Sequence, residues 1–114
     1  MEGAFLRGIE QFNQREFFEC HETLEGIWMG ERGPRRLFLQ GLIHFAVGYY
    51  HVQRGNPAGA RRQLRKGLKK IAAYLPLCES VDTWRLYMEV RDTLASLESG
   101  QRLDGFPHIT FREA

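Results

Sequence analysis

The chain has 114 residues, a formal net charge of +2 and 43% hydrophobic residues, which suits one globular domain with a real hydrophobic core. No segment approaches the ~20 apolar residues of a membrane span, and the first residues lack the apolar run of a secretory signal. Two cysteines, Cys20 and Cys78, are too few for a disulfide framework. We therefore expect a single domain over residues 1–114, located in the cytoplasm, with free thiols and no membrane contact.

The first two expected helices occupy the first thirty residues. Phe5, Ile9 and Phe12 recur at the spacing of an amphipathic helix. The second helix is expected from about residue 16 to residue 29. The glycine-flanked turn at residues 30–34 ends it, because glycine and proline interrupt helices.

The third expected helix, over residues 34–53, is apolar on most sides and is therefore expected to lie at the centre of a bundle. Pro34 suits its first position. The segment R-G-N-P then ends this helix and starts the next one. Gly55 suits a C-terminal cap, Asn56 an N-cap and Pro57 a first helical residue.

The fourth helix is expected from Pro57 to about residue 75, where Pro76 ends it. Its inward positions are Ala60, Leu64, Leu68, Ile71, Ala72 and Leu75. Its outer side carries six cations, Arg61, Arg62, Arg65, Lys66, Lys69 and Lys70. The fifth helix is expected over residues 81–98, with Ser80 or Asp82 as its cap. Its apolar positions are Trp84, Tyr87, Met88, Val90, Leu94 and Leu97.

Residues 100–114 show no periodicity and contain Gly105 and Pro107, so we expect an irregular C-terminal tail. Phe106, Ile109 and Phe111 suggest that this tail packs back onto the helices. No strand is expected before the tail. The predicted fold class is all-α, a compact single-domain bundle of about five helices.

Charge is distributed unevenly along the chain. Residues 1–31 hold seven acids, whereas residues 32–78 hold ten Lys or Arg and no acid. One interpretation is that acidic and basic helices pair within the fold or across a homodimer. The other is a patch for nucleic acid or another polyanion. The fourth helix has no interleaved aromatic residues and belongs to no recognised DNA-binding module, so nucleic acid is the weaker hypothesis.

A polar constellation stands out in the second helix. His21 and Glu25 are one helical turn apart and lie at the edge of its buried stripe. Folding the chain about residues 32–33 places residue i opposite roughly residue 65 minus i. Glu25 then lies near Gln40, and His21 near His44. We expect these four side chains to meet inside the bundle.

Three interpretations of this cluster remain open. The first is a buried hydrogen-bond network without chemistry, which would fix the register of the helices. The second is a divalent metal site for zinc, iron or manganese with His21, Glu25 and His44 as ligands. The third is general acid–base or metal-assisted hydrolysis, in which Glu22 or Glu25 takes a proton from water. A different class of function is a non-catalytic scaffold or interaction module. The sequence does not establish whether the protein is an enzyme.

Neighbouring residues have supporting roles in these hypotheses. Glu22 points about 100° away from His21 on the helix, and Trp28 is expected to pack against the cluster. His51 lies roughly 10 Å beyond His44 along the helix, so it should not share a metal ion with it. The segment H-E-T-L-E lacks the second histidine of the zinc-protease pattern, since Glu25 stands in its place.

Three segments carry a resemblance to a known family: F-N-Q-R-E-F-F-E-C-H-E-T-L-E-G-I-W, L-F-L-Q-G-L-I-H-F-A-V-G-Y-Y-H and R-G-N-P-A-G-A. Over about residues 5–75 the chain resembles domain of unknown function 309, a small all-helical family of bacteria and archaea. The family's hallmark of histidine, glutamate and an aromatic residue falls on His21, Glu25 and Trp28. The resemblance implies a helical fold and metal binding by this motif. In the family the position of His44 is often glutamine, which makes His51 the more characteristic histidine.

Overall fold

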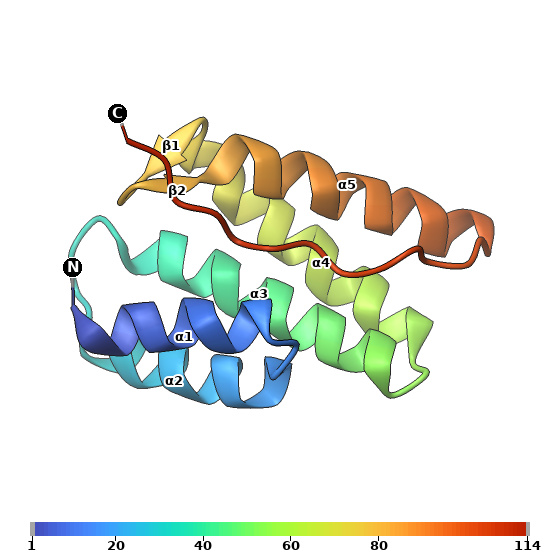
Figure 1. The fold of residues 1–114 in the computed structure, drawn as a ribbon, viewed down its shortest axis with the longest axis horizontal. Coiled ribbons are helices and arrows are strands. Elements are labelled where there is room, and N and C mark those ends of the chain that lie inside the picture. The colour runs from blue at the N-terminus through green and yellow to red at the C-terminus, as the bar shows by residue number, and fades with distance from the viewer. Residues whose placement is uncertain (1, 114) are drawn as a thin grey trace.

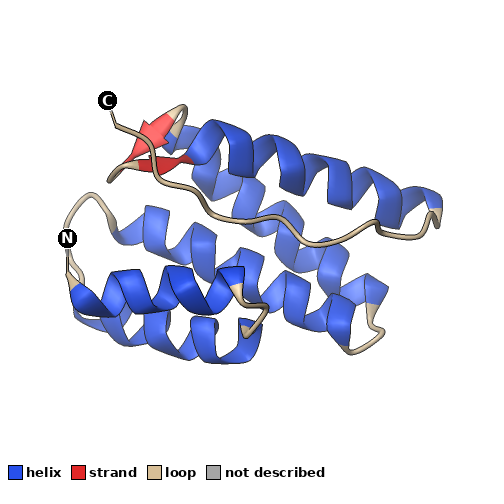
Figure 2. Cartoon of the chain, viewed as in Figure 1, coloured by secondary structure: helices blue, strands red, loops and turns tan. Residues whose placement is uncertain are grey.

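The computed structural model describes residues 2–113 and shows a helical bundle, as predicted (Figures 1 and 2). Its five α-helices are α1 (Gly3–Asn13), α2 (Phe17–Gly30), α3 (Arg36–Gln53), α4 (Pro57–Ile71) and α5 (Thr83–Ser99). A 3-10 turn (Ala72–Tyr74) and a small antiparallel hairpin of β1 (Leu77–Cys78) and β2 (Val81–Asp82) connect α4 to α5. The extent of the domain over residues 1–114 stays a prediction, since residues 1 and 114 lie outside the described part.

Each helix packs against the one before it in the chain, and the contact between α3 and α4 is the most extensive (Figure 1). Short connections make consecutive helices antiparallel neighbours. As a result α3 lies between α2 and α4, and its apolar sequence is explained by burial against both. None of the helices within residues 2–113 is long and apolar enough to cross a bilayer.

Glycines let α3 and α4 approach closely. A Cβ atom added to Gly67 would lie 2.5 Å from the ring of Phe45 and 3.0 Å from the backbone oxygen of Gly41. A Cβ on Gly48 would similarly lie 2.6 Å from Leu64. Because a side chain at these positions would push the helices apart, the glycines define how α4 sits on α3, and therefore which α4 side chains reach the polar cluster.

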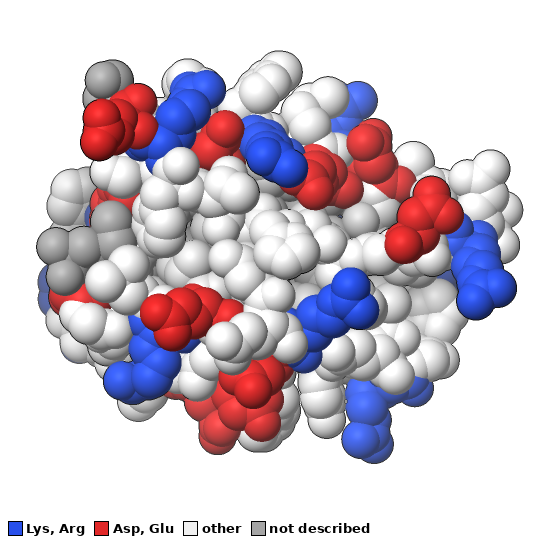
Figure 3. Space-filling view, viewed as in Figure 1, with Lys and Arg blue, Asp and Glu red and all other residues white. Residues whose placement is uncertain are grey.

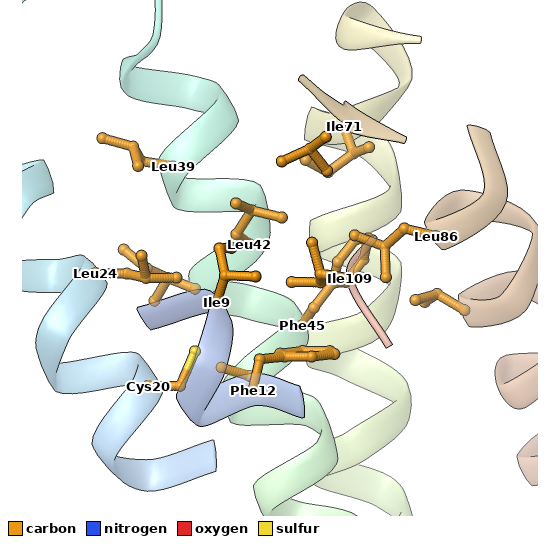
Figure 4. Close-up of a cluster of buried hydrophobic side chains, with 14 of the residues drawn as sticks. Ile9, Phe12, Cys20, Leu24, Leu39, Leu42, Phe45, Ile71, Leu86 and Ile109 are labelled. Atoms are coloured by element: carbon orange, nitrogen blue, oxygen red, sulfur yellow. The ribbon is translucent and has the colours of Figure 1, made fainter. Parts of the chain in front are cut away.

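The hydrophobic core fills the space between the helices and the C-terminal tail (Figure 4). Its largest fully buried side chains come from α1, α2, α3 and α4 and include Phe5, Phe12, Phe17, Phe38, Phe45 and Tyr49. The hydroxyl of Tyr49 donates a hydrogen bond to Thr93 of α5 over 2.9 Å, which satisfies a polar group that would be costly to bury alone. The core therefore joins all five helices.

The predicted helix caps agree with the structure. The Asn56 side chain accepts a hydrogen bond from the backbone N–H of Gly59 over 3.0 Å, and Pro57 is the first residue of α4. Gly55 has a positive φ of 70°, which glycine adopts at little cost. Asp82 caps α5 by accepting from the N–H of Arg85 over 2.9 Å. Short polar side chains at these positions therefore identified two helix starts correctly.

Several predicted boundaries were wrong. α3 begins at Arg36 and not at Pro34, because the glycine-flanked turn extends two residues further. The fourth helix ends at Ile71, and the 3-10 turn replaces its predicted last residues, so Ala72 is exposed. The hairpin before α5 was not predicted, and its strands are only two residues long. Trp84, expected to be buried, is also exposed, because it lies on the outer side of the first turn of α5.

The C-terminal tail is irregular and runs back along α5 towards the hairpin (Figure 1). Asn13 at the end of α1 holds it with two hydrogen bonds, since its amide donates to the Ile109 carbonyl over 2.9 Å and accepts from the Ile109 N–H over 2.7 Å. Ile109 is buried and Phe106 partly so, as predicted. Phe111 is exposed, contrary to the prediction, and only its backbone contacts the hairpin, through a bridge with Val81.

Candidate functional site

The fold-back of α2 onto α3 brings the predicted polar residues together. His21, Glu25, Gln40 and His44 line one pocket of about 280 Å³, as the pairing rule predicted. The remaining lining residues are Trp28, Ile43, Val47 and Gln63. Gln63 belongs to α4, so the pocket is formed by three consecutive helices.

His21 and Glu25 contact each other, but they are not inside the bundle. The Nε2 atom of His21 lies 3.3 Å from a carboxylate oxygen of Glu25, and the side chains are 25% and 46% exposed. The buried stripe of α2 is formed by Phe17, Cys20 and Leu24, which leaves this pair at the rim. The expectation that this pair lies inside the bundle was therefore wrong, because within residues 2–113 the edge of α2 that carries it is open to solvent. The cluster is a surface pocket.

His44 turns towards α4 and makes contacts that the sequence did not indicate. Its Nδ1 atom lies 2.8 Å from the side-chain oxygen of Gln63, and its Nε2 atom lies 3.3 Å from the ammonium nitrogen of Lys70. An amide oxygen only accepts hydrogen bonds and an ammonium only donates them. Nδ1 therefore carries the proton, and the Nε2 lone pair faces Lys70.

Burial is the main cause that lowers the pKa of His44 from its ordinary value of 6.5, and the positive charges of Lys70 and Lys66 lower it further. The hydrogen bond with Gln63 acts in the opposite direction. The imidazole is therefore neutral at pH 7. Gln63 and Lys70 are site residues that the sequence reasoning missed, and the glycine spacing of α3 and α4 is the one signal that could have indicated them.

A three-ligand metal centre at His21, Glu25 and His44 does not fit this arrangement. Both ring nitrogens of His44 are engaged, and the lysine charges that disfavour its protonation also disfavour a metal cation beside it. Within residues 2–113 no group of three or more His, Cys, Asp or Glu side chains is placed to hold a metal ion. The expected binding of zinc, iron or manganese would then rest on His21 and Glu25 alone, one protein ligand fewer than open zinc sites usually have.

Trp28 forms a rigid wall of the pocket. The guanidinium of Arg36 lies 4.1 Å from its ring centre, and the same group donates to the carbonyls of Trp28 and Glu31 over 2.8 and 2.7 Å. The indole N–H of Trp28 is buried without a hydrogen-bond partner among protein atoms of residues 2–113. The pocket wall therefore contains one buried donor without a protein partner among the described residues.

His51 belongs to a second pocket, in agreement with the expectation that it does not share a site with His44. This pocket has a volume of about 190 Å³ and is lined by Phe17, Phe18, His21, Val47, Tyr50 and His51. His21 and Val47 line both pockets, so the two lie side by side, and together they are named here the α2–α3 groove. The predicted supporting residue Glu22 is exposed and lines neither pocket.

The charges on either side of this groove have opposite signs. α2 carries Glu19, Glu22 and Glu25, and α4 carries the six cations of its outer side. Lys66 and Lys70 lie on the groove side of α4, because both act on the charge of His44. Within the described chain no ion pair joins α2 to α4; the α4 pair is Arg65 with Glu98 of α5, 2.6 Å apart. Binding of nucleic acid by the α4 cations stays a prediction.

On another face of the molecule, charges of opposite sign are mixed rather than separated. Over α1, α5 and the tail, acidic and basic side chains lie next to one another (Figure 3). Arg35 likewise contacts carboxylates from three segments, Glu2, Glu31 and Glu79, at 2.8, 3.7 and 2.9 Å. Local neutralisation is therefore common in this protein, and the separated charges beside the groove are an exception to it.

Comparison with known proteins places these residues in a family context. The sequence model described as "Domain of unknown function (DUF309)" matches residues 5–63, which include most of α1, all of α2 and α3, and about the first half of α4. The uncharacterized protein YpuF of Bacillus subtilis (strain 168) is 36% identical over 72 residues. That alignment covers 61% of this chain but only 41% of YpuF. The match over more than half of the chain, groove included, shows that the protein belongs to the DUF309 family.

Proposed function

We propose that the protein is a non-catalytic interaction module that docks through the outer side of α2, α3 and α4, named here the groove face. The observation that supports this most directly is the α2–α3 groove itself. It is open, largely apolar at one end, and bordered by acids and cations that have no partners across it within residues 2–113. Apolar centres with charged rims are typical of protein interfaces.

Exposed apolar side chains on α2 support the same proposal. Phe18 is 45% exposed and Met29 is 63% exposed. At helical spacing they share one side of α2 with Glu22 and Glu25. Aromatic residues and methionine are enriched at interfaces, because they contribute much contact area. The ring of Phe18 also lies 5.5 Å from that of Tyr50, which extends the apolar surface onto α3.

The groove is less suited to catalysis. His44 is held between Gln63 and Lys70, so its nitrogens are not free to exchange a proton with a substrate. The carboxylate of Glu25 is nearly half exposed, and water competes for it. The neighbouring thiol of Cys20 is fully buried, and burial raises its pKa to about 12, so it is not a nucleophile at neutral pH. These properties favour recognition over reaction chemistry.

Site-specific photo-crosslinking in cells tests this proposal. A benzophenone amino acid replaces Phe18 in the groove face, and the matched control replaces Trp84, an exposed aromatic residue at 52% on α5. We expect a discrete adduct from position 18 and none from position 84. The adduct should disappear when Val47→Glu is added, because a charge in the groove opposes docking. Absence of an adduct at position 18, or equal adducts at both positions, would contradict the proposal.

A further inference from the structure

We infer that the partner of the groove face is a second copy of this chain, related by a two-fold axis that runs parallel to α3 in the interface. This inference rests on the proposed function, since it names the occupant of the same face. Homodimers with two-fold symmetry are the commonest oligomers, and their interfaces must be self-complementary. The groove face is self-complementary in charge only when the two-fold axis runs parallel to α3.

The order of the helices selects the orientation. α3 lies between α2 and α4. A two-fold axis parallel to α3 places α3 on its copy, and α2 of each chain opposite α4 of the other. An axis perpendicular to α3 would instead place α2 on α2 and α4 on α4. Only the first arrangement brings opposite charges together, and like charges across an interface are strongly unfavourable.

The charges available for this pairing are specific. Glu25 lines the groove and Glu22 is exposed one turn before it on α2, while Arg62 and Lys66 are exposed one turn apart on α4. None of these four makes a salt bridge with another helix in the described chain. Ion pairs at an interface rim are screened by solvent, so their main effect is to set orientation and partner choice.

The centre of the face has the pattern of a helix pair. Along the side of α3 that lines the groove and into its C-cap Arg54, residues recur at alternating spacings of three and four: Gln40, Ile43, Val47, Tyr50 and Arg54, of which Ile43 is only 8% exposed. This is the spacing of a and d positions in a parallel two-stranded coiled coil, with an apolar middle and polar ends. A two-fold axis parallel to α3 makes each residue face its own copy, as in such a coiled coil. Val47 then lies at the centre of the dimer.

The size of the face is adequate. α3 is about 27 Å long at ~1.5 Å per residue. Three adjacent helices at interaxial distances of 8–10 Å cover roughly 20 Å of width, so the face measures on the order of 500 Å² in projection. Standard interfaces bury about 800 Å² of accessible surface per partner, which is of the same order.

Sedimentation velocity on the untagged full chain provides the first test. We expect a species of twice the 13.3 kDa chain mass, and Val47→Glu should convert it to the monomer. A chain that remains monomeric at high micromolar concentration overturns the inference. In that case a position-18 adduct with a different protein would leave the proposed function standing, and absence of any adduct would remove both.

Charge reversal tests the orientation. Glu22→Lys with Glu25→Lys, or Arg62→Glu with Lys66→Glu, should each raise the dimer dissociation constant by about tenfold or more. Combining all four changes in one chain should restore dimerisation, because α2 and α4 then exchange signs. An axis perpendicular to α3 would give no such restoration. Unchanged affinity in both double variants overturns the orientation.

Cysteine crosslinking gives independent evidence on the axis. In a background with Cys78→Ser, single changes Gln40→Cys, Val47→Cys and Arg54→Cys each place a thiol at a different height along α3. Disulfides need Cα atoms within about 7 Å. If the axis is parallel to α3, all three variants should form disulfide-linked dimers on mild oxidation. If only one of the three crosslinks, the axis lies across α3 and the inference is wrong.

Discussion

The Nε2 atom of His44 lies 3.3 Å from the ammonium nitrogen of Lys70, and its Nδ1 atom lies 2.8 Å from the amide oxygen of Gln63. This arrangement attaches α3 to α4 beside the groove and keeps the imidazole neutral. It also explains why a histidine next to the family motif is not free to act as a ligand. The pKa of His44 should therefore report on whether its contacts with Lys70 and Gln63 form in solution.

The pKa of His44 should rise when the charge of Lys70 is removed. Lys70 lowers this pKa, so Lys70→Gln should shift it upwards in an NMR titration of the imidazole. An unchanged or lower pKa of His44 in this variant would show that the Lys70 contact does not form in solution.

Stability should decrease when pH falls through the ordinary pKa of histidine. The pKa of His44 is lowered in the folded state, so below about pH 6.5 the unfolded chain binds a proton that the folded chain does not. The free energy of unfolding should therefore fall as the pH drops below about 6.5. Urea titrations should show a smaller decrease for His44→Gln. An equal pH dependence in wild type and variant would contradict this assignment.

Glu25→Ala should have a small effect on stability. The carboxylate of Glu25 is 46% exposed, and exposed ion pairs contribute about 0–1 kcal/mol. Denaturant unfolding should therefore show a loss below about 1 kcal/mol. Tyr49→Phe is the buried comparison, because it leaves Thr93 without the hydrogen bond of the tyrosine hydroxyl and should cost about 1–3 kcal/mol. A loss of several kcal/mol for Glu25→Ala would mean that this side chain is buried in solution.

Metal analysis of untagged protein should show no stoichiometric zinc, iron or manganese. His21 and Glu25 supply two donors, whereas His44 is engaged with Gln63 and Lys70. Three protein ligands are usual even in open zinc sites. Elemental analysis after dialysis against each metal would check this. Stoichiometric metal in the wild type that disappears in His21→Ala would contradict it and would restore the metal interpretation.

Local sequence signals predicted the parts of the site that depend on neighbouring elements. The short connection between α2 and α3 was sufficient to place His21 and Glu25 beside Gln40 and His44, since hairpin pairing follows from the position of the turn. The helix caps Asn56 and Asp82 were also predictable, because each accepts a hydrogen bond from a backbone N–H only three residues further along the chain. The two-residue strands before α5 were missed, because so short a segment has no measurable periodicity.

The remaining features depend on contacts between distant parts of the chain. Whether His21 and Glu25 are buried depends on whether another element covers α2, which periodicity within α2 does not show. The contacts of His44 with Gln63 and Lys70 depend on how α4 sits on α3. That register follows from the close approach at Gly41 and Gly67, and glycines in a helix sequence are compatible with several packings.

Gly67→Ala should destabilise the protein, although alanine is the better helix former. In α4 the added Cβ would lie 2.5 Å from the Phe45 ring and 3.0 Å from the Gly41 oxygen, and overpacking of this kind costs about 1–3 kcal/mol. Gly26→Ala in α2 is the matched control, since nothing lies within 4 Å of its added Cβ. That change should stabilise the helix by about 0.5–1 kcal/mol. Equal effects of the two changes in thermal unfolding would contradict the close packing of α3 and α4.

Asn13→Ala should release the C-terminal tail from α1. The Asn13 amide makes both hydrogen bonds to the Ile109 backbone, at 2.7 and 2.9 Å, and Ile109 is buried in the core. Loss of both bonds leaves buried backbone groups unpaired, which costs about 1–3 kcal/mol each when no water replaces the partner. The backbone amides of Ile109 and Asp82 should then exchange with solvent faster in hydrogen-exchange measurements, because the Asp82 N–H donates to Thr110 of the same tail.

Asn13→Asp is the informative companion, since it keeps the acceptor for the Ile109 N–H and removes only the donor to its carbonyl. Its exchange rates should lie between those of wild type and Asn13→Ala, and identical rates in all three proteins would show that the tail is held by its apolar contacts alone.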